Sequence, residues 1–376
     1  MRQDTSTELS AEDNLRLNVL LASKPLAIRI NESRMTVEGL TEKREARIML
    51  NPVGRSEAYL RRVRESISGH VLGSPGGYPV YLKRWTRMGQ MRDESLAQLL
   101  LLGEPEAVVA AVCAPGLSDE LARRAWWVME DAENARRMLG SAAVVHGEMG
   151  KILARYLVEH LPFETEPVTM IETVRLVLQP GLIDQVGREE LWKRGDRKNA
   201  LRVGFLIATP DDLPLLARPR DDALELGERL AGLADAGNTP AATLLQAMSA
   251  TGQGFLAACA DILDKPANQD VVNTMLDIIA VHFGALRPEG RAKHTLEELL
   301  AEAEEYLLAT EVEACVSLAP EWAAELRALR VLSGLSYAVV RPVLAGSTAG
   351  GSLMRRKLAP VMGPLLGQLQ VLQGTA

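Results

Sequence analysis

From Asp93 onward, good helix formers such as Ala, Leu, Glu and Arg recur in short runs that Gly and Pro interrupt. Over residues 94–140 this pattern predicts about four short helices, with Gly103, Pro115 and Gly116 as stops. Short helices joined in this way pack as antiparallel pairs, and each pair buries its apolar face against its neighbours. The sequence therefore predicts a mainly α protein with a helical-array, solenoid-like body, although it has no strict repeat period.

Longer helices are predicted in the rest of the body, at approximately residues 141–160, 168–178, 221–235, 240–263, 269–284, 295–317 and 320–340. A capping box over residues 295–298 opens the sixth of them. The seventh should end before Pro342, because proline cannot continue the hydrogen-bond ladder of a helix. A last helix follows the Gly-rich segment 346–352, and we expect Pro360 and Pro364 to interrupt it.

The first 50 residues carry the clearest β signal. A helix is predicted to begin at Ser10, with Leu15, Val19 and Leu20 on its apolar face. The strings PLAIRI, RMTVEGL and EARIMLN then alternate apolar and polar residues, which predicts two or three short antiparallel strands.

A change of composition near residue 93 indicates a domain boundary. We expect a small α/β subdomain over residues 1–92 and an all-helical body over residues 93–376. A weaker boundary is predicted near residues 212–220, where prolines cluster.

Three cysteines, Cys113, Cys259 and Cys315, lie far apart in apolar helical contexts. Their odd number and wide spacing predict no disulfide framework, and we expect all three thiols to be buried. The N-terminus is polar, and no apolar run approaches the roughly 18 residues that span a bilayer. We therefore expect a cytoplasmic, soluble protein without membrane insertion.

Most motifs that encode a catalytic geometry are absent. The chain contains no GxxxxGK[ST] loop, no HExxH or ExxH pair and no GxSxG nucleophile elbow. Residues 252–257 match GxGxxA, but a dinucleotide site needs a preceding strand, and the residues before this match are predicted to be helical. We interpret these small residues as a close helix crossing.

Metal sites are not favoured either. His294, Glu297 and Glu298 lie near one helical turn, but a helix cap with an acidic first turn explains them. His146 and His160 lie on one predicted helix and would be about 21 Å apart. The sequence therefore assigns no catalytic residue, cofactor or metal ligand.

Two further features have a structural interpretation. The side chains of Trp126 and Trp127 diverge by about 100° on a helix, so only one ring can lie fully on the core face of that helix. The other ring is expected to fill an adjoining contact, with a partner or ligand role as the alternative. The string REELWKRGDR, residues 188–197, predicts a solvated helix end with surface salt bridges.

Residues 55–92 form a basic segment in an acidic protein. Eight Arg or Lys residues face Glu57 and Glu65, which leaves a balance of +6 in a chain of net charge −7. A basic amphipathic helix is predicted from Ser56 to Val71, and Gly73 should end it.

Two interpretations of this basic segment remain open. In one, its arginines pair with acidic helices downstream and dock the N-terminal subdomain onto the body. In the other, the segment binds RNA, DNA or another anion. Tyr78, Tyr81 and Trp85 would then stack, and an extended chain from Tyr78 to Lys83 would form an edge strand. The candidate contact residues are Arg61, Arg62, Arg64, Gly76, Gly77, Tyr78, Tyr81, Lys83, Arg84, Trp85 and Arg87.

Several long strings resemble the DsrS proteins of sulfur-oxidising bacteria, which are encoded with the reverse-acting dissimilatory sulfite reductase cluster. They are LNVLLASKPLAIRI, HVLGSPGGYPVYLKRWTRMGQMRDESLAQLLLLGEPEAVVAAV, DELARRAWWVMEDAENARRML and VRLVLQPGLIDQ. The resemblance covers roughly residues 10–210. It implies a cytoplasmic protein associated with the oxidation of stored sulfur, and it brings no catalytic residues.

A sulfur carrier would need an accessible thiolate, which the predicted burial of the cysteines disfavours. We therefore expect a non-enzymatic accessory or regulatory protein whose partners are other proteins of the sulfur-oxidation machinery. The alternatives are a regulator that binds nucleic acid through the basic segment, and an enzyme with an unrecognised site where that segment meets the acidic body. The sequence gives no oligomeric state.

Overall fold

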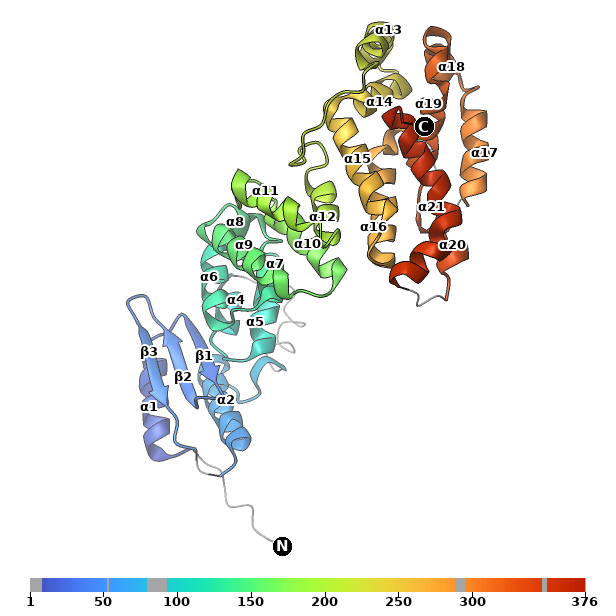
Figure 1. Ribbon diagram of the computed structural model, residues 1–376. Helices are drawn as coiled ribbons and strands as arrows, with labels where there is room; N and C mark the ends of the chain where they lie inside the picture. Colours follow the sequence, from blue (N-terminus) through green and yellow to red (C-terminus); the bar gives the residue numbers. More distant parts are fainter. Residues whose placement is uncertain (1–8, 53, 80–92, 288–294, 347–349, 376) are drawn as a thin grey trace. The chain divides into compact units, whose positions relative to one another are not determined.

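The computed structural model describes residues 9–52, 54–79, 93–287, 295–346 and 350–375 (Figure 1). Within these residues the chain forms twenty α-helices and one sheet of three antiparallel strands near the N-terminus. The predicted mainly α fold with a small α/β part is therefore confirmed. The chain divides into two compact units, residues 1–160 (unit 1) and 161–376 (unit 2).

Unit 1 begins with a helix and a β-meander. Their bounds are α1 (Ala11–Ala22), β1 (Ala27–Asn31), β2 (Thr36–Leu40), β3 (Glu45–Met49) and α2 (Ser56–Leu72). Ser10 caps α1 by accepting the N–H of Asp13 at 3.1 Å. The strand order is β1-β2-β3, and Val37 pairs with Ile30 on one side and Ile48 on the other. The predicted first helix and strands are confirmed.

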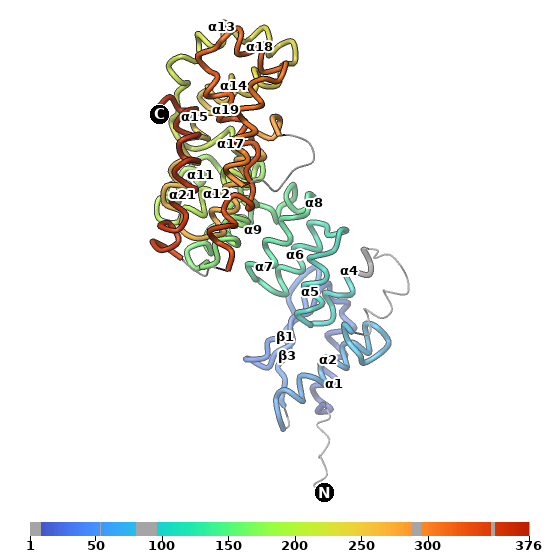
Figure 2. The backbone as a smooth tube through the Cα atoms, turned by 90° about the vertical axis from the view of Figure 1, so that its right-hand side faces the viewer, coloured from blue at the N-terminus to red at the C-terminus, as the bar shows by residue number. Residues whose placement is uncertain are grey.

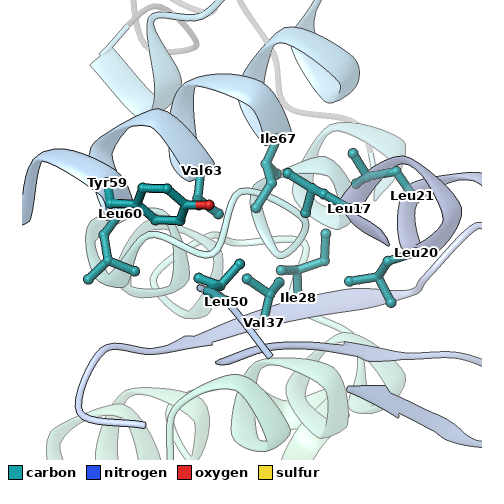
Figure 3. Packing of buried hydrophobic residues seen from close by; sticks show 10 residues of the cluster. All are labelled: Leu17, Leu20, Leu21, Ile28, Val37, Leu50, Tyr59, Leu60, Val63 and Ile67. Carbon is teal, nitrogen blue, oxygen red and sulfur yellow. The ribbon is translucent and has the colours of Figure 1, made fainter. Parts of the chain in front are cut away.

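Alternation along the strands separates an apolar face from a charged one. On the apolar face, Ile28 and Val37 meet buried side chains of α1 and α2, among them Leu17, Val63 and Ile67 (Figure 3). Fully burying one such side chain contributes about 1.5–3 kcal/mol. This cluster is therefore the core that holds the two helices on the sheet.

The predicted apolar face of the first helix is only partly correct. Leu20 is buried together with Leu17 and Leu21, whereas Leu15 and Val19 point to solvent and are 65% and 63% exposed. The helix carries two apolar stripes on opposite sides. Only the tertiary structure decides which stripe packs on the sheet.

Six further helices complete unit 1 (Figure 2). They are α4 (Asp93–Leu99), α5 (Pro105–Val112), α6 (Asp119–Val128), α7 (Ala132–Met138), α8 (Ala142–Val145) and α9 (Glu148–His160). The first four are the short helices that the Gly and Pro positions predict.

The single helix predicted over residues 141–160 is wrong, because the chain breaks at Gly147. The carboxylate of Asp119 accepts the N–H groups of Glu148 and Met149, both at 3.1 Å, and so caps α9 from another helix. A Cβ atom at Gly147 would lie 2.1 Å from that carboxylate. His146 consequently precedes α9 instead of sharing a helix with His160.

The sheet is bonded to the helices that follow it. The N–H of Ile28 donates to the carbonyl of Leu100 at 2.9 Å, and Arg29 donates to the carbonyl of Trp127 at 3.0 Å. These bonds join residues on both sides of residue 93 within unit 1. The boundaries predicted near residues 93 and 212–220 stay predictions.

The described residues of unit 2 form helices and loops, without a strand. Its α-helices are α10 (Pro167–Val177), α11 (Gln185–Arg194), α12 (Ala200–Ala208), α13 (Ala223–Asp235), α14 (Thr239–Met248), α15 (Ala250–Asp264), α16 (Gln269–His282), α17 (Leu296–Tyr306), α18 (Thr310–Leu318), α19 (Ala323–Ser333), α20 (Tyr337–Leu344) and α21 (Gly351–Gln373). Short 3-10 turns lie at Leu161–Phe163 (η1), Gly284–Leu286 (η2) and Pro320–Trp322 (η3). The C-terminal α21 packs against both α15 and α19, a contact that nearest-neighbour stacking does not produce (Figure 1).

Three of the predicted long helices of unit 2 are each two helices. The helix predicted over residues 240–263 breaks at Ser249, which accepts the N–H of Gly252 and so caps α15. The helix predicted over residues 295–317 is α17 followed by α18, and the one predicted over residues 320–340 contains the break between α19 and α20. In α18, Val312 and Cys315 are buried. A break between two consecutive helices is hard to predict from the spacing of apolar residues, because that spacing is helical on both sides of the break.

The helix ends and interruptions predicted at three prolines are also wrong. Pro342 lies inside α20, and α21 continues through Pro360 and Pro364. An internal proline costs about 3 kcal/mol relative to alanine. Buried side chains such as Leu358 and Leu365 offset that cost along α21, so burial overrides the local penalty. In the part of the chain that the structure describes, no helix combines the length and the apolar character needed to cross a membrane.

Candidate functional site

The basic segment is partly described. Its helix α2 ends at Gly73, which adopts the left-handed conformation with φ of 69° and confirms the predicted stop. The candidate contacts Tyr81, Lys83, Arg84, Trp85 and Arg87 lie outside the described residues. Arg61, Arg62 and Arg64 lie on α2, and Gly76, Gly77 and Tyr78 follow it.

The arginines of α2 pair locally. Arg62 bonds Glu65 at 2.8 Å, and Arg64 bonds Glu32, which lies in the turn between β1 and β2. Arg61 is exposed. The downstream acidic helices predicted as docking partners are therefore not the partners of Arg62 or Arg64. Surface pairs of this kind contribute at most about 1 kcal/mol each.

The loop after α2 is held from two sides. The hydroxyl of Ser68 donates to the carbonyl of Ser74 and accepts the N–H of Gly77, both at 2.7 Å. The N–H of Tyr78 donates to Glu104, the residue before α5, at 3.1 Å. A Cβ at Gly77 would lie 2.3 Å from the Glu104 carboxylate, and φ there is 59°.

The backbone at Gly77, a candidate contact residue, is therefore approached closely by a carboxylate of this chain. The extended conformation considered for residues 78–83 is wrong at its start, because Tyr78 and Pro79 have helical backbone. This local clamp joins the basic segment to the residue that precedes α5.

Cys113 lies close to Tyr78. Burial raises the pKa of the Tyr78 phenol, and the nearby Cys113 raises it further. The thiol of Cys113 is exposed, so its predicted burial is wrong. It follows the last turn of α5 and borders an open hollow of about 690 Å³ that Ser118, Arg137 and Ser141 also line.

The other two thiols are buried, as predicted. Burial raises the pKa of Cys259 well above its ordinary value, and it also raises that of Cys315. The thiol of Cys315 donates to the side-chain oxygen of Asn238 at 3.1 Å. Both therefore have the environment of unreactive core cysteines.

Both tryptophans of α6 make contacts within unit 1. The indole N–H of Trp127 donates to Glu45 on β3 at 2.8 Å, and the guanidinium of Arg29 lies 4.7 Å above its ring. Trp126 meets Tyr156 of α9 edge to face at 4.8 Å. Each ring is half-buried, and both fill contacts of the adjoining kind that was expected for one of them.

Trp127 covers the charged face of the sheet, where Glu38 is 3% exposed. The carboxylate of Glu38 forms ion pairs with Arg29 on β1 and with Arg47 on β3, the latter at 2.7 Å. Burial alone would raise the pKa of Glu38, but the hydrogen bonds and charges of the two arginines lower it below its ordinary value. This ion triad crosses all three strands.

A second ion cluster, which includes the buried Glu325, lies in unit 2. Arg220 bonds Asp222 at 2.7 Å and Glu325 at 2.8 Å, and it donates to the carbonyl of Val371 at 3.0 Å. The indole of Trp322 also donates to Asp222 at 3.0 Å. The cluster joins segments far apart in sequence, and no spacing or motif in the sequence predicts it.

The residues considered for metal or nucleotide binding have structural roles. Thr295 and Glu298 form the predicted capping box, while His294 lies outside the described residues. The GxGxxA match lies within α15, which follows α14 directly. A Cβ at Gly252 would lie 2.2 Å from the carbonyl of Gln246 at the end of α14, and one at Gly254 would meet Leu215 of a loop at 3.1 Å. The small residues therefore permit close packing at a helix junction and against a loop. Within the described ranges, no three His, Cys, Asp or Glu side chains group so as to hold a metal ion.

No motif or spacing in the sequence marks His282. Its ring stacks on Phe255 at 3.8 Å, and its Nε2 atom is buried without a hydrogen-bond partner in the described structure. Burial lowers its pKa, so the imidazole is neutral at pH 7. It borders an apolar hollow of about 300 Å³ between α12, α15 and α16.

The predicted surface salt bridges of residues 188–197 are present, since Arg188 pairs with Asp212 at 2.8 Å and Asp196 pairs with Arg202.

Comparisons of the chain with protein-family models, with curated proteins and with solved structures found no match.

Proposed function

We propose that this chain is a non-enzymatic accessory or regulatory protein of cytoplasmic dissimilatory sulfur oxidation, and that it acts by binding another protein of that machinery. The association with sulfur oxidation rests on the resemblance to the DsrS proteins. The mode of action rests on the surface of α1.

The observation that carries the proposal is the outer stripe of α1, formed by Leu15 and Val19. The two side chains lie one helical turn apart on the side opposite the core and are 65% and 63% exposed. Helices dock into grooves of partner proteins through apolar anchors at this spacing. Because the core uses the other stripe of α1, this one is available to a partner.

The contacts of the polar and aromatic side chains in unit 1 also support a binding role. Arg29, Glu38 and Trp127 hold the sheet against α6, and Glu104 holds the loop before Tyr78. Groups of these types could form a reaction site, but here they stabilise the fold.

The test is a pull-down from cells that are oxidising sulfur, read by mass spectrometry. Wild-type protein is expected to capture components of the sulfite reductase. The double variant Leu15→Ser/Val19→Ser should lose them, because it removes both anchors without changing the core. A matched control is Leu224→Ser/Val281→Ser in unit 2, where both side chains are 78% exposed, and this variant should capture the same proteins as wild type.

Three outcomes would count against the proposal. If wild type captures no sulfite reductase component, the assignment to this machinery fails. If the Leu15/Val19 variant captures as much as wild type, the outer stripe of α1 is not the binding surface. Recovery of ribosomal or RNA-bound material instead would favour nucleic-acid binding by the basic segment.

A further inference from the structure

A basic hollow lies in unit 2 between η1 and the turn that joins α11 to α12. Its volume is about 480 Å³, within the range typical of small-molecule sites. Its walls are formed by Leu161, Pro162, Lys193, Arg194, Asp196, Arg197, Lys198 and Leu201. Four of these eight residues are cationic, and one is acidic.

The turn that forms the hollow is held in place by its own contacts. The ammonium of Lys198 donates to the carbonyl of Glu164 at 3.0 Å, which ties the turn to η1. At Gly195 a Cβ would lie 2.4 Å from Arg202, so only glycine lets the chain pass there without a shift. The N–H of Gly195 donates to the carbonyl of Trp192 at 2.9 Å. The cations are therefore presented by the end of α11 and by the constrained turn that follows it.

The single acidic residue of the hollow is neutralised from outside it. Asp196 pairs with Arg202, which also bonds Asp261 at 2.6 Å and lies over the ring of Trp192. Lys193 and Arg197 are exposed, and neither forms an ion pair with another described residue. Lys193 and Arg197 thus give the hollow positive charge that no ion pair within the described residues compensates.

The floor of the hollow is apolar. Leu161 and Leu201 border it and are only 4% and 3% exposed. Cations at the end of α11 have a structural explanation, because Lys193 and Arg194 offset the negative end of that helix. That explanation does not account for Arg197, which lies beyond the helix, or for the apolar floor beside the cations.

We propose that this hollow binds a small organic oxyanion, a phosphate or carboxylate joined to an apolar body. Arginine binds such oxyanions with two parallel hydrogen bonds, while the two leucines would cover the apolar part. A hollow of about 480 Å³ matches a small molecule better than an acidic peptide, which would need an extended groove. The inference goes beyond the proposed function and does not depend on it.

Four matched probes test this inference on the full-length protein by calorimetry at low salt. They are phenyl phosphate, benzoate, inorganic phosphate and phenol. Phenyl phosphate and benzoate combine a charge with an apolar ring, so at least one should bind more tightly than inorganic phosphate and phenol, and the pair distinguishes phosphate from carboxylate. Absence of binding by both at millimolar concentration would overturn the proposal.

The double variant Lys193→Gln/Arg197→Gln should weaken binding of the preferred probe by about tenfold or more, because it removes both exposed cations. The control Arg34→Gln/Lys151→Gln removes the same charge from exposed positions in unit 1 and should bind like wild type. Equal affinity in wild type and the first variant, or equal loss in both variants, would show that the hollow is not the site. Circular dichroism checks that each variant is folded.

Discussion

The three thiols of this protein differ in their surroundings and therefore in their chemistry. Cys113 follows the last turn of α5 and is exposed, whereas Cys259 and Cys315 lie within α15 and α18 and are buried. The reactive species of a cysteine is the thiolate, and burial disfavours it. Reactivity should therefore be confined to one of the three.

We expect iodoacetamide to alkylate Cys113 in the native protein while Cys259 and Cys315 remain unmodified. The buried thiols can react only after local opening, which should slow them by about a hundredfold or more. Mass spectrometry of peptides from a time course measures each site. Alkylation of all three at one rate in folded protein would contradict the burial of Cys259 and Cys315, and a denatured sample gives the reference rate.

At the scale of secondary-structure elements, contacts from elsewhere in the chain decide where helices begin and end. Asp119 caps α9 from α6, and a tight approach at Gly252 separates α15 from α14. Conversely, α21 continues through Pro364 because its other face is buried. The sheet depends in the same way on Glu38, a buried carboxylate shared by two arginines of neighbouring strands.

The lowered pKa of Glu38 predicts acid-sensitive stability. The ordinary pKa of this carboxyl is 4.5, so its contribution is complete above that value and is lost as the pH falls through the lower pKa of the folded state. Glu38→Gln should therefore lower the free energy of unfolding by about 1–3 kcal/mol at pH 7 and by less in acid. Urea denaturation at several pH values measures both effects.

The matched control for this change is Glu32→Gln, which removes an exposed carboxylate that pairs with Arg64. We expect it to change stability by less than about 1 kcal/mol at any of these pH values. A Glu38→Gln variant that is as stable as wild type at pH 7, or that shows an unchanged slope with pH, would mean that the triad does not stabilise the sheet.

At the scale of the molecule, each unit has its own interior, and the Arg220 cluster connects distant parts of unit 2. Arg220 precedes α13, Glu325 lies on α19, and Val371 lies near the end of α21. The guanidinium also offsets the negative end of α21 by binding its last carbonyls. Removing it would leave Asp222 and Glu325 without their counter-ion.

Arg220→Met should therefore destabilise unit 2 by about 3–5 kcal/mol, the usual effect of breaking a buried ion pair. Hydrogen exchange of the full-length chain, read by mass spectrometry, should show faster exchange in peptides from unit 2 and unchanged exchange in the core of α2. Arg229→Met is the control, because its ion pairs with Glu225 and Glu321 are more exposed and should contribute less than about 1 kcal/mol. Equal effects of the two substitutions would contradict this role of Arg220.

The sequence alone determined the local features of this protein. Strand alternation over residues 27–49, the cap at Ser10, the capping box at Thr295 and the stop at Gly73 are set by neighbours within a few residues. Such short-range hydrogen bonding and backbone preferences can be recognised from the order of residues. The mainly α class follows from the same local signals.

Only the tertiary structure decided which residues meet across long separations. It turned Leu15 and Val19 outward, exposed Cys113, ended α8 before Gly147 and assembled the cluster at Arg220. It also gathered the cations of the turn after α11 over Leu161, where the sequence predicted no more than a solvated helix end. Each of these outcomes depends on burial and charge contributed by distant segments, and neither periodicity nor propensity contains that information.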